Sequence, residues 1–258
     1  MATHKTMEKM SKLKKPPADD RISDLPDEIL CHILTFLPTK FAFATSVLSK
    51  RWTSLYHSLT FIKFDDKSVE DHDQFLHFCR SVEAVTLSPH VQQKPIKKFY
   101  LRCGGYGNWH IPPVDVWIEA VNQRGVDYIH LSMNLNPLMP VGDELIALTN
   151  VLFNSQNLVV LKLNNLVLSD NVSSVNLPSL KTLHLKRVYF NDFKDLKKLL
   201  SGCSILEELH TNYFRAKKLR LGYETSLSKL VRASIRPFDV PFKAVYNVKS
   251  LCILQVQI

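Results

Sequence analysis

Few residues of this sequence have types and spacings that would support catalysis or metal binding. His72, His77 and Cys79 lie close together, but their spacing does not match a zinc-binding pattern, and a solvated helix face explains them better. The glycine-rich run 103–107 lacks the residue order of a nucleotide-phosphate loop and is interpreted as a plain loop. No GxSxG or HExxH motif occurs, and no cysteine has the Cys–His signature of a catalytic thiol. The sequence therefore predicts no catalytic residue, no metal ligand and no cofactor.

The polar residues that favour a binding role alternate with apolar residues in a series of short segments. The pattern apolar-x-x-apolar-x-apolar predicts a short strand with one buried face, so the intervening polar residues face the other way. Side by side they would form a basic, histidine-rich stripe that binds an acidic or phosphorylated protein segment, although a merely solvated positive face fits the pattern equally well. The stripe is predicted to contain Tyr100, Arg102, His130, Lys162, Asn164, His184, Lys186, His210 and Arg220.

The same apolar pattern recurs from about residue 95 onward, at irregular spacings near the roughly 20–29 residues of leucine-rich repeats. Intervening stretches such as 193–200 are predicted to be helices on the outer side. Because no single repeat buries its apolar face alone, neighbours are expected to stack into an irregular solenoid, with a mixed α/β domain of another type as the alternative. Clear instances begin at Ile96, Val126, Leu158, Leu180 and Leu206, and weaker copies begin at Ala216, Leu230 and Val248.

Residues 20–60 are predicted to form a small helical module. Its expected N-caps are Asp24, Thr39 and Ser49, and Pro38 ends the first helix. The first helix has two apolar stripes, and so small a module can bury only one of them without help. The second stripe therefore needs a partner or the downstream domain, unless both stripes belong to an intramolecular core. The stripes are Ile29, Ile33 and Phe36, and Leu30, Leu34 and Leu37.

Residues 61–95 are interpreted as a rigid junction between the module and the repeats. The stretch 58–66 alternates like a strand, and 74–87 has the pattern of a helix. The inward residues of that helix are expected to be Phe75, Phe78, Val82 and Val85.

The bulk composition restricts the kind of protein and its location. The chain of 258 residues has a formal net charge of +9, but its basic residues are spread out and no helix-turn-helix, zinc or aromatic-platform signature accompanies them, so nucleic-acid binding is the weaker interpretation. Five widely spaced cysteines, with no secretory signal and no apolar run long enough to span a membrane, predict free thiols and a nuclear or cytoplasmic location. Residues 1–19 are predicted to be a disordered basic tail, in which Lys12–Lys15 is either a nuclear import signal or a solvated stretch.

The helical module closely resembles an F-box. The resemblance is carried by the runs 25–30, 33–34, 37–38 and 46–52, whose order and spacing are those of the family. In that family the module docks on a Skp1-like adaptor and, through it, on a cullin. Tyr56 departs from the pattern, because relatives often place Trp there, but it keeps an aromatic body. The resemblance implies adaptor contacts at Leu25, Pro26, Leu30, Ile33, Leu34, Leu37, Pro38, Val47 and Trp52, and it leaves open which of Ile33 and Leu34 faces the adaptor.

The later segments resemble the repeats of plant F-box/LRR-repeat proteins of the F-box/FBD/LRR type. Ser155 departs from the pattern, because relatives usually have Cys there. The chain also ends at Ile258 inside a repeat-like segment, whereas many relatives continue with more repeats and an FBD region. A short paralogue and a truncated gene model both fit this ending. The similar segments are 117–126, 157–163, 177–185 and 199–209.

The resemblance covers roughly residues 20–258 and implies both a fold and a function. The expected fold is α/β, with a small three-helix F-box module followed by an irregular leucine-rich-repeat solenoid. The implied function is the substrate-recognition subunit of a Skp1–cullin–F-box (SCF) ubiquitin ligase, a non-catalytic adaptor whose repeats bind an unknown target protein. A degenerate F-box/LRR protein without a target is the alternative. The expected boundaries are a tail at 1–19, an F-box at 20–60, a junction at 61–95 and repeats at 96–258.

Overall fold

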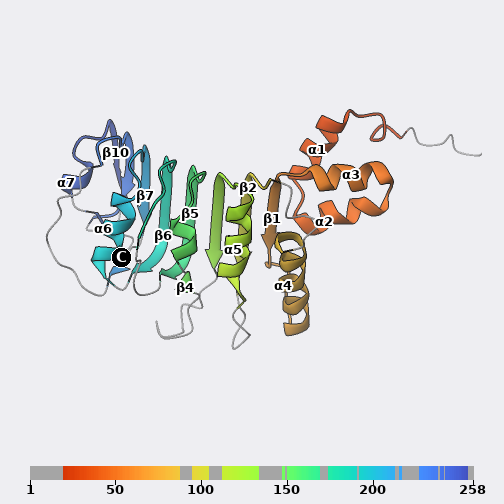
Figure 1. Ribbon diagram of the computed structural model, residues 1–258, viewed down its shortest axis with the longest axis horizontal. Helices are drawn as coiled ribbons and strands as arrows, with labels where there is room; N and C mark the ends of the chain where they lie inside the picture. The colour runs from red at the N-terminus through yellow and green to blue at the C-terminus, as the bar shows by residue number, and fades with distance from the viewer. Residues whose placement is uncertain are drawn as a thin grey trace, which may run out of the picture.

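A helical module lies at one end of the molecule, beside the first strand of a long parallel sheet (Figure 1). The predicted tail, most of the glycine-rich loop, Arg220 and the last four residues lie outside the described part of the chain. Among the described residues, no helix has the length and apolar character needed to cross a membrane. The computed structural model describes residues 20–87, 95–104, 112–133, 147–148, 150–168, 174–190, 192–212, 215–216, 227–237, 239–240 and 242–254.

The helical module folds around a small core of its own. The helices pack so that Leu30, Leu34, Ala42 and Leu55 are buried together, with Trp52 among the half-buried side chains around them. These positions follow the 3.6-residue period of a helix, which brings residues i and i+4 to one face. The elements are α1 (Asp27–Thr35), α2 (Thr39–Ala44), the 3₁₀-helix η1 (Thr45–Val47) and α3 (Lys50–Ser58).

Only one of the three predicted helix caps is present. The Ser49 hydroxyl accepts a hydrogen bond from the backbone N–H of Trp52 at 3.4 Å, as predicted. The prediction for Asp24 is wrong, because α1 starts directly after Pro26 and has no side-chain cap. The prediction for Thr39 is also wrong, since its hydroxyl accepts instead from the backbone N–H of Lys63 at 2.8 Å. Thr39 thereby ties the module to the sheet.

The sheet is parallel throughout, and its main strands lie side by side in chain order. The order is β1-β2-β3-β5-β6-β7-β9-β10, while the short strands β4 and β8 pair with β5 and β6. Consecutive parallel neighbours require a connection that crosses back over one face, which is the arrangement expected of a repeated strand–crossover unit. The strands are β1 (Phe61–Asp65), β2 (Lys98–Cys103), β3 (Tyr128–Met133), β4 (Ala147–Leu148), β5 (Val160–Leu168), β6 (Thr182–Phe190), β7 (Glu208–Asn212), β8 (Arg215–Ala216), β9 (Arg232–Ile235) and β10 (Ser250–Ile253).

Alternating burial gives the sheet two different faces. Residues such as Ile129, Leu161 and Leu183 are fully buried, whereas the residues between them are half-buried or exposed. The buried face and the inner sides of the crossover helices form one continuous core, which includes Trp117 and Leu199. The crossover helices are α4 (His72–Thr86), α5 (Val114–Gln123), the 3₁₀-helix η2 (Asn150–Phe153), α6 (Phe193–Ser201) and α7 (Phe242–Val245).

The segment interpreted as a junction supplies the first strand and helix of this sheet domain. Strand β1 pairs with β2 in parallel over its whole length. Phe75 and Val82 of α4 are buried in the sheet's core, and Phe78 and Val85 pack against it, as predicted. The first strand–helix unit therefore begins directly after the helical module.

Strands β5 and β6 contain the same irregularity at the same register. Asn165 and Arg187 have φ angles of 53° and 52°, in the left-handed region. At both positions the burial alternation shifts by one residue, so Leu166 and Val188 pair with each other and face the core. Because both strands have their left-handed residue at the same register, they remain paired beyond it.

Candidate functional site

The helical module presents a set of large apolar side chains to solvent. They are between 40% and 83% exposed, with Val47 and Phe36 the most exposed at 83% and 72%. A monomer rarely leaves so many large apolar side chains uncovered within so short a segment. We call this set the helical-module patch, and its members are Ile29, Ile33, Phe36, Phe41, Phe43, Val47 and Leu48.

The structure separates the two apolar stripes that the sequence predicted on α1. Leu30 and Leu34 are 0% and 1% exposed in the module's own core, and a contact of either with an adaptor stays a prediction. Ile33 is 40% exposed, and so it is Ile33 and not Leu34 that faces outward. The physical reason is the helical period, which turns the stripe that includes Ile29 and Ile33 away from the core.

The other predicted adaptor contacts fall into two groups. Val47 and Pro26 are exposed. Leu25, Leu37 and Trp52 are half-buried and pack against the module's core. Pro38 is also half-buried.

Four members of the helical-module patch were not among the adaptor contacts predicted from the sequence: Phe36, Phe41, Phe43 and Leu48. Sequence reasoning assigned Phe36 to a stripe but not to the surface, and it gave no role to Phe41, Phe43 or Leu48. The sequence feature that could have pointed to Phe41 and Phe43 is that they flank Ala42 in α2. Because Ala42 is the residue that packs into the core, the two phenylalanines beside it are left exposed.

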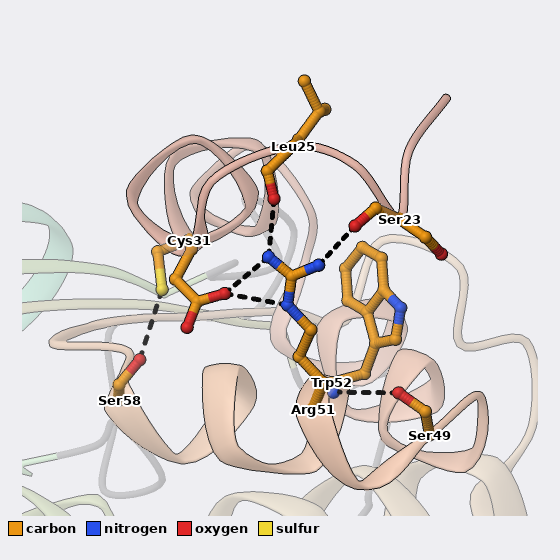
Figure 2. Close-up of polar contacts among 8 residues, drawn as sticks. Ser23, Leu25, Cys31, Ser49, Arg51, Trp52 and Ser58 are labelled. Atoms are coloured by element: carbon orange, nitrogen blue, oxygen red, sulfur yellow. Dashed lines mark hydrogen bonds and ion pairs between the residues drawn. The ribbon is translucent and has the colours of Figure 1, made fainter. Parts of the chain in front are cut away.

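Arg51 of α3 holds the segment that precedes α1 (Figure 2). Its guanidinium donates to the carbonyl oxygens of Ser23 and Leu25, each at 2.5 Å, and its Nε donates to the Asp27 carboxylate at 2.8 Å. The guanidinium of this one arginine therefore fixes both the backbone around Leu25 and the first turn of α1. The sequence placed Arg51 and Asp27 in the motif but indicated no contact between them.

The open face of the sheet brings together the polar residues predicted for the stripe. Tyr100, His130, Lys162, His184 and His210 occupy the same register position on successive strands. The neighbouring row, two residues further along each strand, contains Arg102, Ser132, Asn164, Lys186 and Asn212. Every predicted member of the stripe except Arg220, which lies outside the described residues, is in these two rows.

Side chains within the rows contact one another across the strands. Asn164 Nδ2 and His130 Nε2 are 2.9 Å apart, and the rings of Tyr100 and His130 meet edge to face at 4.7 Å. The His184 and His210 rings are 5.2 Å apart. The Lys162 ammonium lies 5.7 Å from the centre of the Tyr128 ring. These contacts leave the rows ordered and rich in hydrogen-bond donors.

The open face is basic, and its histidines are held neutral. Burial, and then the charge of Lys162, lowers the pKa of His130 to about 4. The pKa values of His184 and His210 are lowered as well, first by burial and then mainly by Lys162 and Lys186, respectively. On the described strands, the charged members of this face include Lys63, Lys98, Arg102, Lys162, Lys186 and Arg232 against Asp65 and Glu208.

The two parts of the chain match two family models. Residues 22–62 match the F-box domain, and residues 114–253 match the model described as "FBD-associated F-box protein At5g56370, LRR repeats". The second match alone covers more than half of the chain. No solved structure shows a significant match.

Curated relatives from Arabidopsis thaliana match 74% of this chain. The putative F-box/LRR-repeat protein At5g41840 is 37% identical over 206 residues, and the F-box/FBD/LRR-repeat protein At4g26340 is 38% identical over 193. The F-box/LRR-repeat protein At1g55660 is 35% identical over 193 residues. The matched regions make up 36%, 43% and 51% of these relatives, so the chain spans only part of their length. The family resemblance predicted from the motifs is thereby confirmed, and the chain belongs to the plant F-box/LRR-repeat family.

Proposed function

We propose that this chain is the substrate-recognition subunit of an SCF-type ubiquitin ligase. In this proposal the F-box docks on a Skp1-like adaptor and, through it, on a cullin, and the repeats bind a target protein. The chain itself breaks no bond, because its contribution is to raise the effective concentration of the target near the ligase. We also propose a nuclear or cytoplasmic location, because the five cysteines are free thiols, as is usual in a reducing compartment.

The helical-module patch is the observation that carries this proposal. Seven large apolar side chains lie exposed between Ile29 and Leu48, whereas the rest of the described chain exposes only five. Burying one such side chain is worth about 1.5–3 kcal/mol, so several together can offset the roughly 4–15 kcal/mol that association costs. The helical-module patch therefore has the composition of a protein-docking surface.

The sheet domain supports the second half of the proposal. We propose that its strand–helix units form an irregular leucine-rich-repeat solenoid whose open face takes the target. The open face is polar and charged, unlike the helical-module patch, so the two surfaces suit different partners. The hydrogen bond from Lys63 to Thr39, together with the packing of α2 on β1, supports a fixed distance between the two partners.

Co-purification of the full chain with a plant Skp1-like protein tests the docking surface. We expect the double substitution Ile33→Asp, Val47→Asp to reduce binding at least tenfold, because it places two charges in an apolar contact. Both side chains lie outside the module's core, so the variant should fold, which circular dichroism can verify. Val116→Asp is the matched control, since Val116 is 44% exposed but lies on α5.

Two results would contradict the docking proposal. One is a folded wild-type chain that does not bind the Skp1-like protein. The other is an equal loss of binding in the Val116→Asp control.

A further inference from the structure

The centre of the open face is a grid of eight side chains without a single acid. It is formed by four neighbouring strands, β3, β5, β6 and β7, which are paired in register. Every side chain in it has a nitrogen or oxygen that can donate a hydrogen bond. We call it the donor grid, and its members are His130, Lys162, His184 and His210 in one row, and Ser132, Asn164, Lys186 and Asn212 in the next.

Two lysines on adjacent strands supply the charge at the middle of the donor grid. Lys162 pairs in register with His184, so their Cα atoms are about one strand spacing apart, roughly 4.8 Å. Lys186 lies two residues beyond His184 on the same strand, at roughly 6.6 Å. Neither lysine forms an ion pair with any residue that the structure describes. Among the described residues, Lys162 lies over the face of Tyr128, a weak contact that its flexible side chain can leave.

Glu208, an acid at the border of the grid, is already partnered. Glu208 is 3.3 Å from the Arg232 guanidinium and 3.7 Å from His184 Nε2. The distance of 3.7 Å to His184 is too long for a hydrogen bond. His184 Nε2 therefore has no hydrogen-bond partner among the described residues. The described residues therefore do not neutralise the positive charge at the centre of the grid.

A doubly charged group with several oxygens fits this arrangement better than a single carboxylate. A carboxylate has one negative charge, which one lysine can balance, whereas a phosphate monoester has a charge of about −1.5 to −2 and three acceptor oxygens. We propose that the donor grid binds a phosphorylated segment of the target protein, with the phosphate over Lys162, His184 and Lys186. This inference rests on the proposed function, since it names the class of target that the repeats would recognise.

The histidines give this site a characteristic response to pH. Their pKa values are lowered in the free protein, so near pH 7 they are neutral. The titratable and charged groups that face them are Tyr100 from β2, Lys162 from β5, Lys186 from β6, Glu208 from β7 and the other two histidines. A bound phosphate adds negative charge beside the imidazoles and raises their pKa values, so binding takes up protons. The affinity should therefore rise as pH falls from about 7.5 to 6.5, by at most about tenfold per pH unit for each proton taken up.

Fluorescence anisotropy with a labelled Gly/Ser peptide containing one phosphoserine tests the proposal on the full chain. The comparison probes are the same peptide without phosphate, the same peptide with Glu, and inorganic phosphate as competitor. We expect the phosphopeptide to bind at least tenfold more tightly than the unphosphorylated peptide, and the Glu peptide to fall between them. Lys162→Met with Lys186→Met should weaken phosphopeptide binding at least tenfold and reduce its pH dependence.

Lys194→Met with Lys229→Met is the control, because it removes the same charge from other exposed positions. Both double variants should still co-purify with the Skp1-like protein, which separates failure of this inference from failure of the docking proposal. The inference is overturned if phosphate has no effect at millimolar peptide, or if the control loses as much affinity. Binding of inorganic phosphate without any preference for the phosphopeptide would also overturn it, because a free phosphate compound would then be the ligand.

Discussion

At the scale of single residues, the F-box depends on a contact between positions far apart in the chain. Arg51 fixes the backbone at Ser23 and Leu25 and pairs with Asp27 at 2.6 Å. Capping rules consider only the polar residues next to the start of a helix, which is why they predicted Asp24 as the N-cap of α1. They cannot detect a guanidinium that arrives from another helix. The residue types of the motif were therefore predictable, whereas the contact that positions them was not.

Arg51→Lys should loosen the segment before α1. A lysine ammonium is a single point charge and cannot bridge the same three acceptors with the geometry of a guanidinium. Because Arg51 is partly exposed, we expect a modest loss of about 1 kcal/mol in the free energy of unfolding, and about tenfold weaker binding to the Skp1-like protein. Thermal unfolding and titration calorimetry measure the two effects. Lys50→Ala is the control on the same helix, and a variant at position 51 that matches wild type in both measurements would refute this role.

At the scale of elements, the end of α6 is packed against the segment before β6. A Cβ added at Gly202 would lie 2.5 Å from both the backbone oxygen and the Cγ1 of Val175. The Gly202 φ of −78° would suit any residue, so space and not backbone conformation requires glycine here. The carbonyl of Gly202 also accepts a hydrogen bond from Leu177, which ties the helix end to the same segment.

Gly202→Ala should therefore destabilise the sheet domain. The backbone of Val175 would have to move, and overpacking of this kind costs about 1–3 kcal/mol. Chemical denaturation should show a lower midpoint for Gly202→Ala, while the exposed neighbour change Ser201→Ala should stay within about 0.5 kcal/mol of wild type. An unchanged midpoint for Gly202→Ala would mean that the helix end can shift freely.

The strand faces could be predicted from the sequence, but other features of the sheet could not. The period-two alternation around residues such as Leu161 and Lys162 was enough to assign the open face, because it is a local property of the chain. The left-handed conformation of Arg187 was not predictable, since arginine does not favour it and its counterpart, the left-handed Asn165, lies on the neighbouring strand. The low pKa of His130 likewise depends on neighbours from other strands.

At the scale of the whole molecule, the F-box covers one edge of the sheet. Strand β1 pairs with β2 on one side only, so its other edge would expose unpaired backbone groups. Helix α2 lies against that edge, and Thr39 satisfies the N–H of Lys63 there. A cavity of about 270 Å³ remains between the module and the first strand–helix unit, lined by residues that include Phe43, Phe64 and Val85. Because the space between the module and this unit is incompletely filled, the hydrogen bond at Thr39 matters for the connection.

Thr39→Val tests how firmly the two parts are connected. Valine keeps the shape of threonine but cannot accept a hydrogen bond, so the N–H of Lys63 would lose its partner at a part-buried site. An unsatisfied group of this kind costs about 1–3 kcal/mol, which should speed hydrogen exchange at the Lys63 amide by roughly tenfold or more. Thr45→Val is the matched control, because the Thr45 hydroxyl bonds only to Ala42 within the module. If the Lys63 amide exchanged equally slowly in Thr39→Val, packing of α2 on β1 alone would hold the F-box against the sheet, and the distance between adaptor and target would not depend on this bond.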